Sequence, residues 1–194
     1  MTPRLPAAER RQQLLDVALH VFGERGYHQA SMNEIADRAG VTKPVLYQHF
    51  RSKRELYLEV LREVGGRLRE AVGKAVATAD GPRQQVENGF KAYFGWVAAT
   101  RGGFDVLFVG ETRRDREFTA EALKVETEIA DAIAELIAVE GLSDERRRLL
   151  AYGIVGIAET TCRHWLSNDL ELDADQLAMQ VAELAWAGLR GLRP

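Results

Sequence analysis

The chain has 194 residues, of which 46% are hydrophobic and 28% are charged, a balance that supplies enough apolar side chains for a folded core. No stretch approaches the ~20 apolar residues of a membrane span, and the first residues lack the apolar run of a secretory signal. The single cysteine, Cys162, excludes an internal disulfide, so we expect a cytoplasmic protein with no membrane partner.

Basic residues are unevenly distributed along the chain, although the net charge is only −3. Residues 1–63 carry ten Lys/Arg and eight Asp/Glu, whereas residues 64–194 carry sixteen and twenty-one. Residues 38–54 contain five basic side chains and no acidic one. This pattern favours phosphate contact by one small module, although a solvated basic surface would produce the same pattern.

The N-terminal part of the chain predicts three short helical segments. The first has an apolar face at helical spacing and ends at Gly26. The residues of that face are Leu14, Val17, Ala18, Val21 and Phe22. Residues 31–34, Ser-Met-Asn-Glu, form a capping box that starts a second helix ending near Gly40. Thr42 then caps a third helix, which has Pro44 in its first turn and runs to about Phe50.

The remainder of the chain also predicts helices. Residues 52–55, Ser-Lys-Arg-Glu, form a second capping box and open a longer helix, which the Gly65-Gly66 pair is expected to bend or interrupt. Further helices are expected near residues 67–79, 82–100, 103–112, 115–140, 143–167 and 174–190. No alternation typical of strands has a useful length, so the sequence predicts an all-α protein.

Residues 31–50 have the organisation of a helix-turn-helix, in which the second helix enters the major groove of DNA. Gly40 provides a residue that adopts a left-handed backbone in the tight turn. Leu46 and Phe50 lie one turn apart and are expected to face the core, which leaves the other side chains of this helix outward. An ordinary helical hairpin with a polar surface is the alternative interpretation.

The outward side chains have the chemistry that DNA requires. Lys43 is a cation for phosphate or guanine, and Gln48 is an amide for adenine. Pro44 and Val45 are apolar groups for thymine methyls, and Tyr47 and His49 are donors to phosphate. Lys53 and the amides at the start of the next helix offer a further phosphate site.

Residues 35–56 resemble the DNA-binding signature of the tetracycline-repressor (TetR) family, and residues 14–27 resemble the first helix of that family. The resemblance covers residues 8–63 without a gap and implies a three-helix DNA-binding domain there. For residues 64–194 it implies a helical domain that senses a small molecule and forms a homodimer. By position, the residues that match DNA contacts of the family are Ser31, Thr42, Lys43, Pro44, Tyr47, His49 and Lys53. Val45 and Gln48 lie where members vary, so we expect them to set the sequence preference.

Four short segments, at residues 43–50, 55–58, 163–166 and 185–189, are similar to a narrower group. This group consists of actinobacterial members that control fatty-acid synthesis in response to long-chain acyl-CoA. The effector is therefore expected to be an apolar small molecule, with a long-chain acyl-CoA as one candidate.

Apolar stripes in the C-terminal part fit either an ordinary core or a ligand tunnel between helices. The candidate ligand contacts are Tyr93, Phe94, Phe108, Glu111, Ile129 and Thr160. The last two helices combine small and large apolar residues, which suits either packing within one chain or a four-helix dimer interface. The candidate interface residues are Gly153, Ile157, Trp165, Val181 and Leu184. A two-fold dimer places two recognition helices ~34 Å apart, as a palindromic operator requires.

The sequence offers no catalytic residue, metal site or cofactor motif. Its four histidines are scattered, and no spacing typical of zinc ligands occurs. Cys162 and His164 do not share a helix face, and no third group is evident that would orient them. The competing class is a helical enzyme or acyl-carrier partner with a fortuitous hairpin, which would need converging acids or a nucleophile in the C-terminal part.

Overall fold

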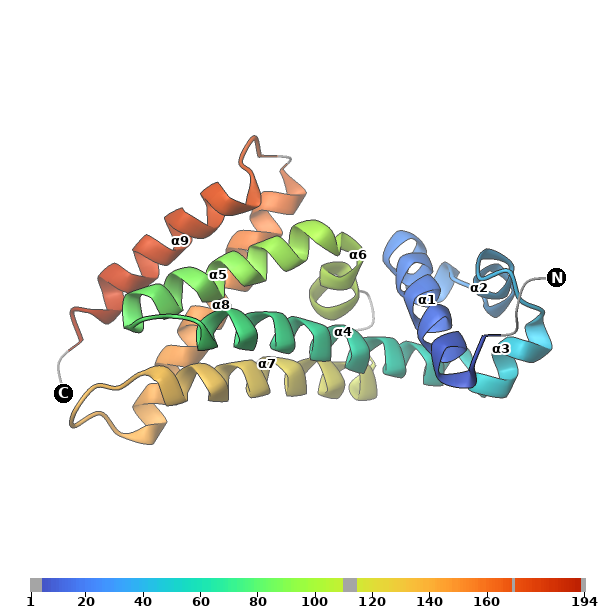
Figure 1. Ribbon diagram of the computed structural model, residues 1–194, viewed down its shortest axis with the longest axis horizontal. Helices are drawn as coiled ribbons and strands as arrows, with labels where there is room; N and C mark the ends of the chain where they lie inside the picture. Colours follow the sequence, from blue (N-terminus) through green and yellow to red (C-terminus); the bar gives the residue numbers. More distant parts are fainter. Residues whose placement is uncertain (1–4, 110–114, 169, 193–194) are drawn as a thin grey trace. The chain divides into compact units, whose positions relative to one another are not determined.

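The computed structural model describes residues 5–109, 115–168 and 170–192, and every regular element within these ranges is a helix (Figure 1). In chain order the elements are α1 (Ala7–Gln29), α2 (Met32–Arg38), α3 (Lys43–His49), α4 (Lys53–Ala77), α5 (Pro82–Ala99), α6 (Arg101–Phe104), the π-helical turn η1 (Asp105–Val109), α7 (Arg116–Leu136), α8 (Asp144–Ser167) and α9 (Ala174–Leu189). The prediction of an all-α fold is confirmed. None of the described helices is long and apolar enough to span a membrane.

The expected interruption at Gly65-Gly66 is wrong, because α4 continues from Lys53 to Ala77 without a break. Two glycines in a helix interior cost about 1 kcal/mol each relative to alanine. Val64 and Leu68 flank the pair and are almost fully buried, with 1% and 0% of their surface exposed. Burial of this helix face outweighs the local preference, as it does for most helices in folded proteins.

The chain divides into two compact units, and the division does not follow the order of the sequence. The first unit comprises residues 1–65 together with residues 100–122, and the second comprises residues 66–99 together with residues 123–194. The segment of α6, η1 and the start of α7 therefore belongs with the N-terminal helices. The two domains predicted from the sequence, residues 8–63 and 64–194, stay a prediction.

The core of the first unit is formed by α1 together with α2, α4, α6 and η1. An aromatic cluster joins sequence-distant elements, with the Tyr57 ring lying 4.9 Å from Phe22 and 4.8 Å from Phe118. The buried Tyr57 hydroxyl donates to the Val106 carbonyl at 3.2 Å. Helix α1 approaches α6 so closely that a Cβ atom on Gly23 would lie 2.6 Å from the Cα atom of Gly102.

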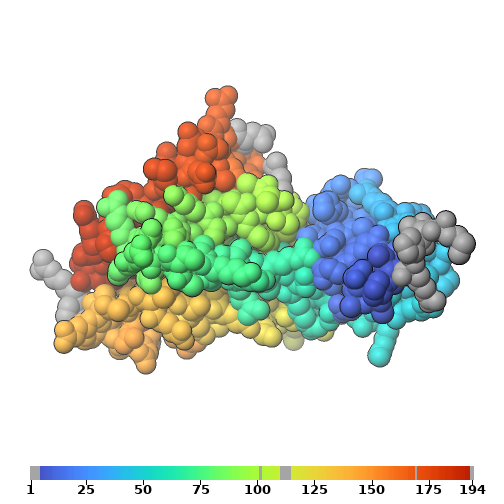
Figure 2. Space-filling view, in the orientation of Figure 1, coloured from blue at the N-terminus to red at the C-terminus, as the bar shows by residue number. Residues whose placement is uncertain are grey.

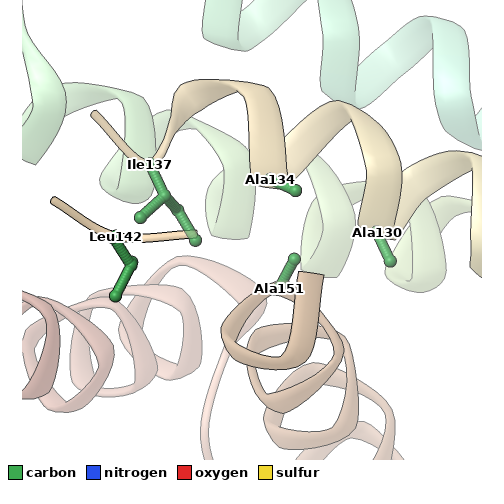
Figure 3. Packing of buried hydrophobic residues seen from close by; sticks show 5 residues of the cluster. All are labelled: Ala130, Ala134, Ile137, Leu142 and Ala151. Carbon is green, nitrogen blue, oxygen red and sulfur yellow. The ribbon is translucent and has the colours of Figure 1, made fainter. Parts of the chain in front are cut away.

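In the second unit α5 and α9 pack side by side, and their surfaces meet directly in Figure 2. The buried residues of α5 are Phe90, Tyr93, Phe94 and Val97, and those of α9 are Leu177, Ala178, Val181, Ala182 and Ala185. A second cluster joins α7 to α8 through small residues. In Figure 3, Ala151 of α8 points toward Ala130 and Ala134 of α7, and alanine at all three positions lets the helices pack closely.

Candidate nucleic-acid interface

The helix-turn-helix is built by local interactions that the sequence specifies. The Ser31 hydroxyl accepts a hydrogen bond from the Glu34 amide at 3.1 Å and so caps the start of α2. Gly40 has a φ of 65°, so the turn before α3 depends on a residue that adopts the left-handed region without strain. Thr42 has the extended backbone of an N-cap residue, although its side chain makes no capping hydrogen bond.

Helix α3 buries one face and exposes the other. Leu46 and Phe50 are both 0% exposed, which confirms that they face the core. Ser31 and four residues of the α3 segment are exposed, namely Thr42, Lys43, Pro44 and Gln48, and 41% of the Tyr47 surface is accessible. Val45 and His49 are half-buried. The predicted DNA-contacting residues on α3 therefore form one accessible surface, which we call the α3 face (Thr42, Lys43, Pro44, Val45, Tyr47, Gln48 and His49).

Two of the five basic residues in the 38–54 run form ion pairs within the protein. Arg38 pairs with Glu24 at 2.6 Å and with Glu34 at 3.0 Å, and the hydrogen bond to Glu24 raises the pKa of Arg38. Arg54 pairs with Asp115 and with Glu117, each at 2.6 Å. Among the described residues, Lys43 and Arg51 are the members of the run whose side chains neither form an ion pair nor bind backbone carbonyls.

Lys53 does not extend freely into solvent. Its ammonium nitrogen donates to the backbone carbonyls of Tyr27 at 2.7 Å, Ala30 at 2.9 Å and His28 at 3.2 Å. The same nitrogen lies 4.6 Å from the centre of the Tyr27 ring. Burial lowers the pKa of Lys53. The contact between Lys53 and a DNA phosphate stays a prediction. The ammonium group that would make this contact already donates hydrogen bonds to the three carbonyls.

The sequence did not suggest the partners of Arg54. Its guanidinium binds Asp115 through two hydrogen bonds of 2.6 and 2.9 Å and packs 4.7 Å from the Phe118 ring centre. The guanidinium lowers the pKa of Asp115 to about 2. The partners lie 61 and 63 residues away along the chain, so no local signal could have identified them, unlike the Arg38–Glu34 pair at helical i,i+4 spacing.

Two of the candidate ligand residues are neighbours in the structure. Tyr93 and Phe94 are buried neighbours on α5, with ring centres 5.2 Å apart, whereas Ile129 is half-buried and Thr160 is exposed. Phe108 is buried in the first unit, and Glu111 lies outside the described residues. The Tyr93 hydroxyl is buried and has no hydrogen-bond partner among the described residues. Burial, together with the nearby Cys162 thiol, raises the pKa of Tyr93.

The candidate dimer residues fall into accessible and inaccessible groups. Gly153 is exposed, Leu184 is 65% exposed, and Ile157 is half-buried. Val181 is only 5% exposed and belongs to the buried hydrophobic core. Trp165 is half-buried, and its indole nitrogen donates to the Leu172 carbonyl at 2.9 Å. Sequence analysis missed three further exposed apolar residues on α8 and α9, namely Leu149 (72%), Met179 (63%) and Tyr152 (42%).

A surface groove of about 570 Å³ runs between α5 and α9. It is lined by Arg83, Glu87, Lys91, Met179, Gln180, Glu183 and Leu184. None of the candidate ligand residues lines it, whereas the exposed Met179 and Leu184 border it. Within residues 5–109, 115–168 and 170–192, no group of three or more His, Cys, Asp or Glu residues could hold a metal ion.

Each of the two parts of the chain matches a model of a known protein family. Residues 14–60 match the model of bacterial regulatory proteins of the tetR family, and residues 82–188 match the model of the tetracyclin repressor-like C-terminal domain. The HTH-type transcriptional activator FasR of Mycolicibacterium smegmatis is 43% identical over 188 residues, which cover 96% of this chain and 85% of that protein.

Solved structures show the same fold. A TetR-like transcriptional regulator from Rhodococcus sp. RHA1 is 31% identical and superposes with a TM-score of 0.79, covering 97% of this chain and all of that one. FadR from Bacillus subtilis, solved in complex with stearoyl-CoA, has a TM-score of 0.80 over 94% of this chain and 99% of its own. At 22% identity that likeness concerns the fold, and the ligand belongs to FadR.

Proposed function

Because the chain belongs to the TetR family of bacterial regulatory proteins, we propose that it is a homodimeric transcriptional regulator that binds a palindromic operator through α3 and is controlled by an apolar small molecule. The observation that carries the DNA-binding part is the exposure of the α3 face. Lys43, Tyr47 and Gln48 are all exposed on this helix, while Leu46 and Phe50 anchor its other side in the core. A regulator of bacterial operators acts in the cytoplasm, where the chromosome lies.

Each residue of the α3 face has a distinct role in this proposal. Lys43 has no ion pair within the described structure and supplies charge to phosphate or a guanine edge. Gln48 and Val45 contact base edges and set the sequence preference. Thr42, Tyr47 and His49 donate to phosphates, as does Ser31 at the start of α2. Pro44, at the start of α3, brings apolar contact to a thymine methyl.

The homodimer is proposed to form through the outer sides of α8 and α9. Four large apolar side chains there are 42–72% exposed, namely Leu149, Tyr152, Met179 and Leu184. Exposed apolar side chains that a partner covers form a contiguous patch, and we propose that these four belong to one. Gly153 and Gly156 on the same helix have nothing within 4 Å of an added Cβ, so a second helix has room to approach them.

A long-chain acyl-CoA is the proposed effector class. The segments at residues 43–50, 55–58, 163–166 and 185–189 resemble members that respond to such ligands, and a protein of this fold, FadR, has been solved with stearoyl-CoA. Tyr93 is the residue that we propose orients the ligand. A buried hydroxyl without a partner costs free energy, and a bound polar group would recover that cost.

The DNA-binding part is tested by fluorescence anisotropy with DNA from the intergenic region upstream of the gene. The wild-type protein should bind this DNA, and Lys43→Met should weaken binding because a phosphate or guanine contact is lost. Lys91→Met is the matched control, since Lys91 is an exposed lysine on α5, which belongs to the other compact unit of the chain. Equal affinities for both variants, or no specific binding by the wild type, would contradict the proposal.

The effector part is tested separately by thermal shift with acyl-CoAs of increasing chain length, free CoA and free fatty acids. A ligand that binds the folded state raises the melting temperature, and the stabilisation grows with the logarithm of one plus its concentration over its dissociation constant. Long-chain acyl-CoA should stabilise the wild type, and Tyr93→Phe should reduce that shift without lowering the melting temperature of the free protein. The absence of a shift with every acyl-CoA would eliminate this effector class and leave DNA binding intact.

A further inference from the structure

The carbonyl groups at the end of α1 converge on one ammonium group. Helix α1 is interrupted at Gly26, whose φ of 71° and ψ of 165° are non-helical and favour glycine. The turns at a helix end leave backbone carbonyls without intrahelical partners. Tyr27, His28 and Ala30 follow the interruption, and the carbonyls of all three accept hydrogen bonds from Lys53 at 2.7 to 3.2 Å.

The ammonium group of Lys53 is fully used by these contacts. A lysine ammonium has three N–H donors, and three carbonyl oxygens accept them here. The Tyr27 ring lies 4.6 Å from the same nitrogen and covers it from a further side. That ring is itself held 5.0 Å from Tyr57 and 5.0 Å from Phe118. No donor remains for a DNA phosphate unless one of these bonds breaks.

We infer that Lys53 is a positioning residue, which acts on operator binding by holding the α1–α2 connection against the start of α4 and not by contacting phosphate. The inference rests on the proposed DNA-binding function. Ala30 directly precedes Ser31, which caps α2, so the carbonyls that Lys53 binds lie at the entrance to the helix-turn-helix. Lys53 is itself the first residue of α4. The contact therefore sets where α2, and α3 after it, lie relative to α4.

The salt dependence of operator binding distinguishes the two roles. Each lysine that neutralises a phosphate contributes about 0.9 to the slope of log affinity against log salt concentration, or about 1.8 for a dimer. A residue that positions the motif changes the affinity equally at every salt concentration and leaves the slope unchanged. Arginine further separates the roles, because its planar guanidinium binds phosphate well but cannot direct three N–H groups from one nitrogen at converging carbonyls.

The experiment compares the full-length wild type, Lys53→Met, Lys53→Arg and Lys43→Met on the operator between about 50 and about 200 mM salt. Both Lys53 variants should bind about tenfold more weakly, equivalent to about 1.4 kcal/mol, with the wild-type slope. Lys43→Met should lower the slope by about 1.8. A similar fall in slope for Lys53→Met, full affinity for Lys53→Arg, or no loss in either Lys53 variant would overturn the inference.

Hydrogen exchange in the absence of DNA provides a readout that does not depend on the proposed function. Amides of residues 26–32 should exchange faster in Lys53→Met and in Lys53→Arg than in the wild type, because the α1–α2 connection has lost the hydrogen bonds from the Lys53 ammonium group. Lys43→Met should leave these amides unchanged. Unchanged exchange in both Lys53 variants would overturn the positioning role, whereas a wild-type protein that fails to bind the operator would overturn the proposed function instead.

Discussion

The close approach of α1 and α6 gives a prediction that opposes local helix preference. Gly23 lies in the interior of α1, where alanine ordinarily stabilises a helix by about 1 kcal/mol relative to glycine. In the folded protein, however, a Cβ atom on Gly23 would lie 2.6 Å from the Gly102 Cα. That distance is about 0.9 Å shorter than an ordinary carbon–carbon contact of about 3.5 Å.

The clash is with backbone, so no side-chain rotation relieves it and α6 must move away from α1. Overpacking of this kind costs about 1–3 kcal/mol, from which the helix-preference gain of up to about 1 kcal/mol is subtracted. Gly23→Ala should therefore lower the free energy of unfolding by up to about 2 kcal/mol, which for a chain of this size corresponds to a fall of up to roughly 8 °C in melting temperature.

Urea and thermal unfolding measured on matched alanine variants check this prediction. Gly73→Ala is the control, because Gly73 lies in the interior of α4 and an added Cβ would meet nothing within 4 Å. This variant should be more stable than the wild type by about 0.5–1 kcal/mol. Gly102→Ala should be nearly neutral, since the nearest atom to its Cβ is 3.4 Å away. If Gly23→Ala stabilises the protein as Gly73→Ala does, the packing argument is refuted.

Three further predictions concern substitutions of single residues. Tyr57→Phe removes the 3.2 Å hydrogen bond to the buried Val106 carbonyl and should cost about 1 kcal/mol in urea unfolding; an unchanged midpoint would show that the bond contributes nothing. Leu184→Glu places a charge on the proposed dimer surface and should shift the protein toward monomer in analytical ultracentrifugation, whereas a persistent dimer would place the interface elsewhere. Arg54 holds the pKa of Asp115 at about 2, below the unfolded value of about 3.9. The ion pair therefore stabilises the fold at pH values above about 3.9, and this contribution is lost as the pH falls toward 2. Arg54→Gln should raise the pKa of Asp115 in NMR titration and reduce the fall of melting temperature between about pH 5 and 2; an Asp115 that still titrates near 2 would assign the effect to the backbone amides that it accepts.

Local sequence signals predicted the helices and the helix-turn-helix well. The Ser31 cap, the left-handed Gly40 and the burial of Leu46 and Phe50 are all present in the structure. The predicted bounds of α5, α8 and α9 agree with the observed helices to within one residue. The predicted TetR-family membership is confirmed by the matches over residues 14–60 and 82–188. The particular DNA, ligand and interface residues remain predictions.

Interpretation of charge from the sequence was less reliable. The five basic residues from Arg38 to Arg54 favoured phosphate contact by one small module, with a solvated basic surface as the alternative. In the fold, Arg38 and Arg54 are paired with carboxylates and Lys53 is bound to carbonyls. A residue's charge can be counted in the sequence, but whether that charge is available to DNA depends on which distant groups the fold brings next to it.

The order of amino acids alone determined the capped start of α2 at Ser31, the bounds of α5, α8 and α9 to within one residue, and which side of α3 is apolar. These properties depend on groups within about four residues of one another, which a helix brings into contact whatever the rest of the chain does. Only the tertiary structure decided that residues 100–122 pack with the N-terminal helices, that α4 continues through Gly65-Gly66, and that Arg54 meets Asp115. Those outcomes depend on burial and on partners as far as 63 residues apart, and no local pattern encodes them.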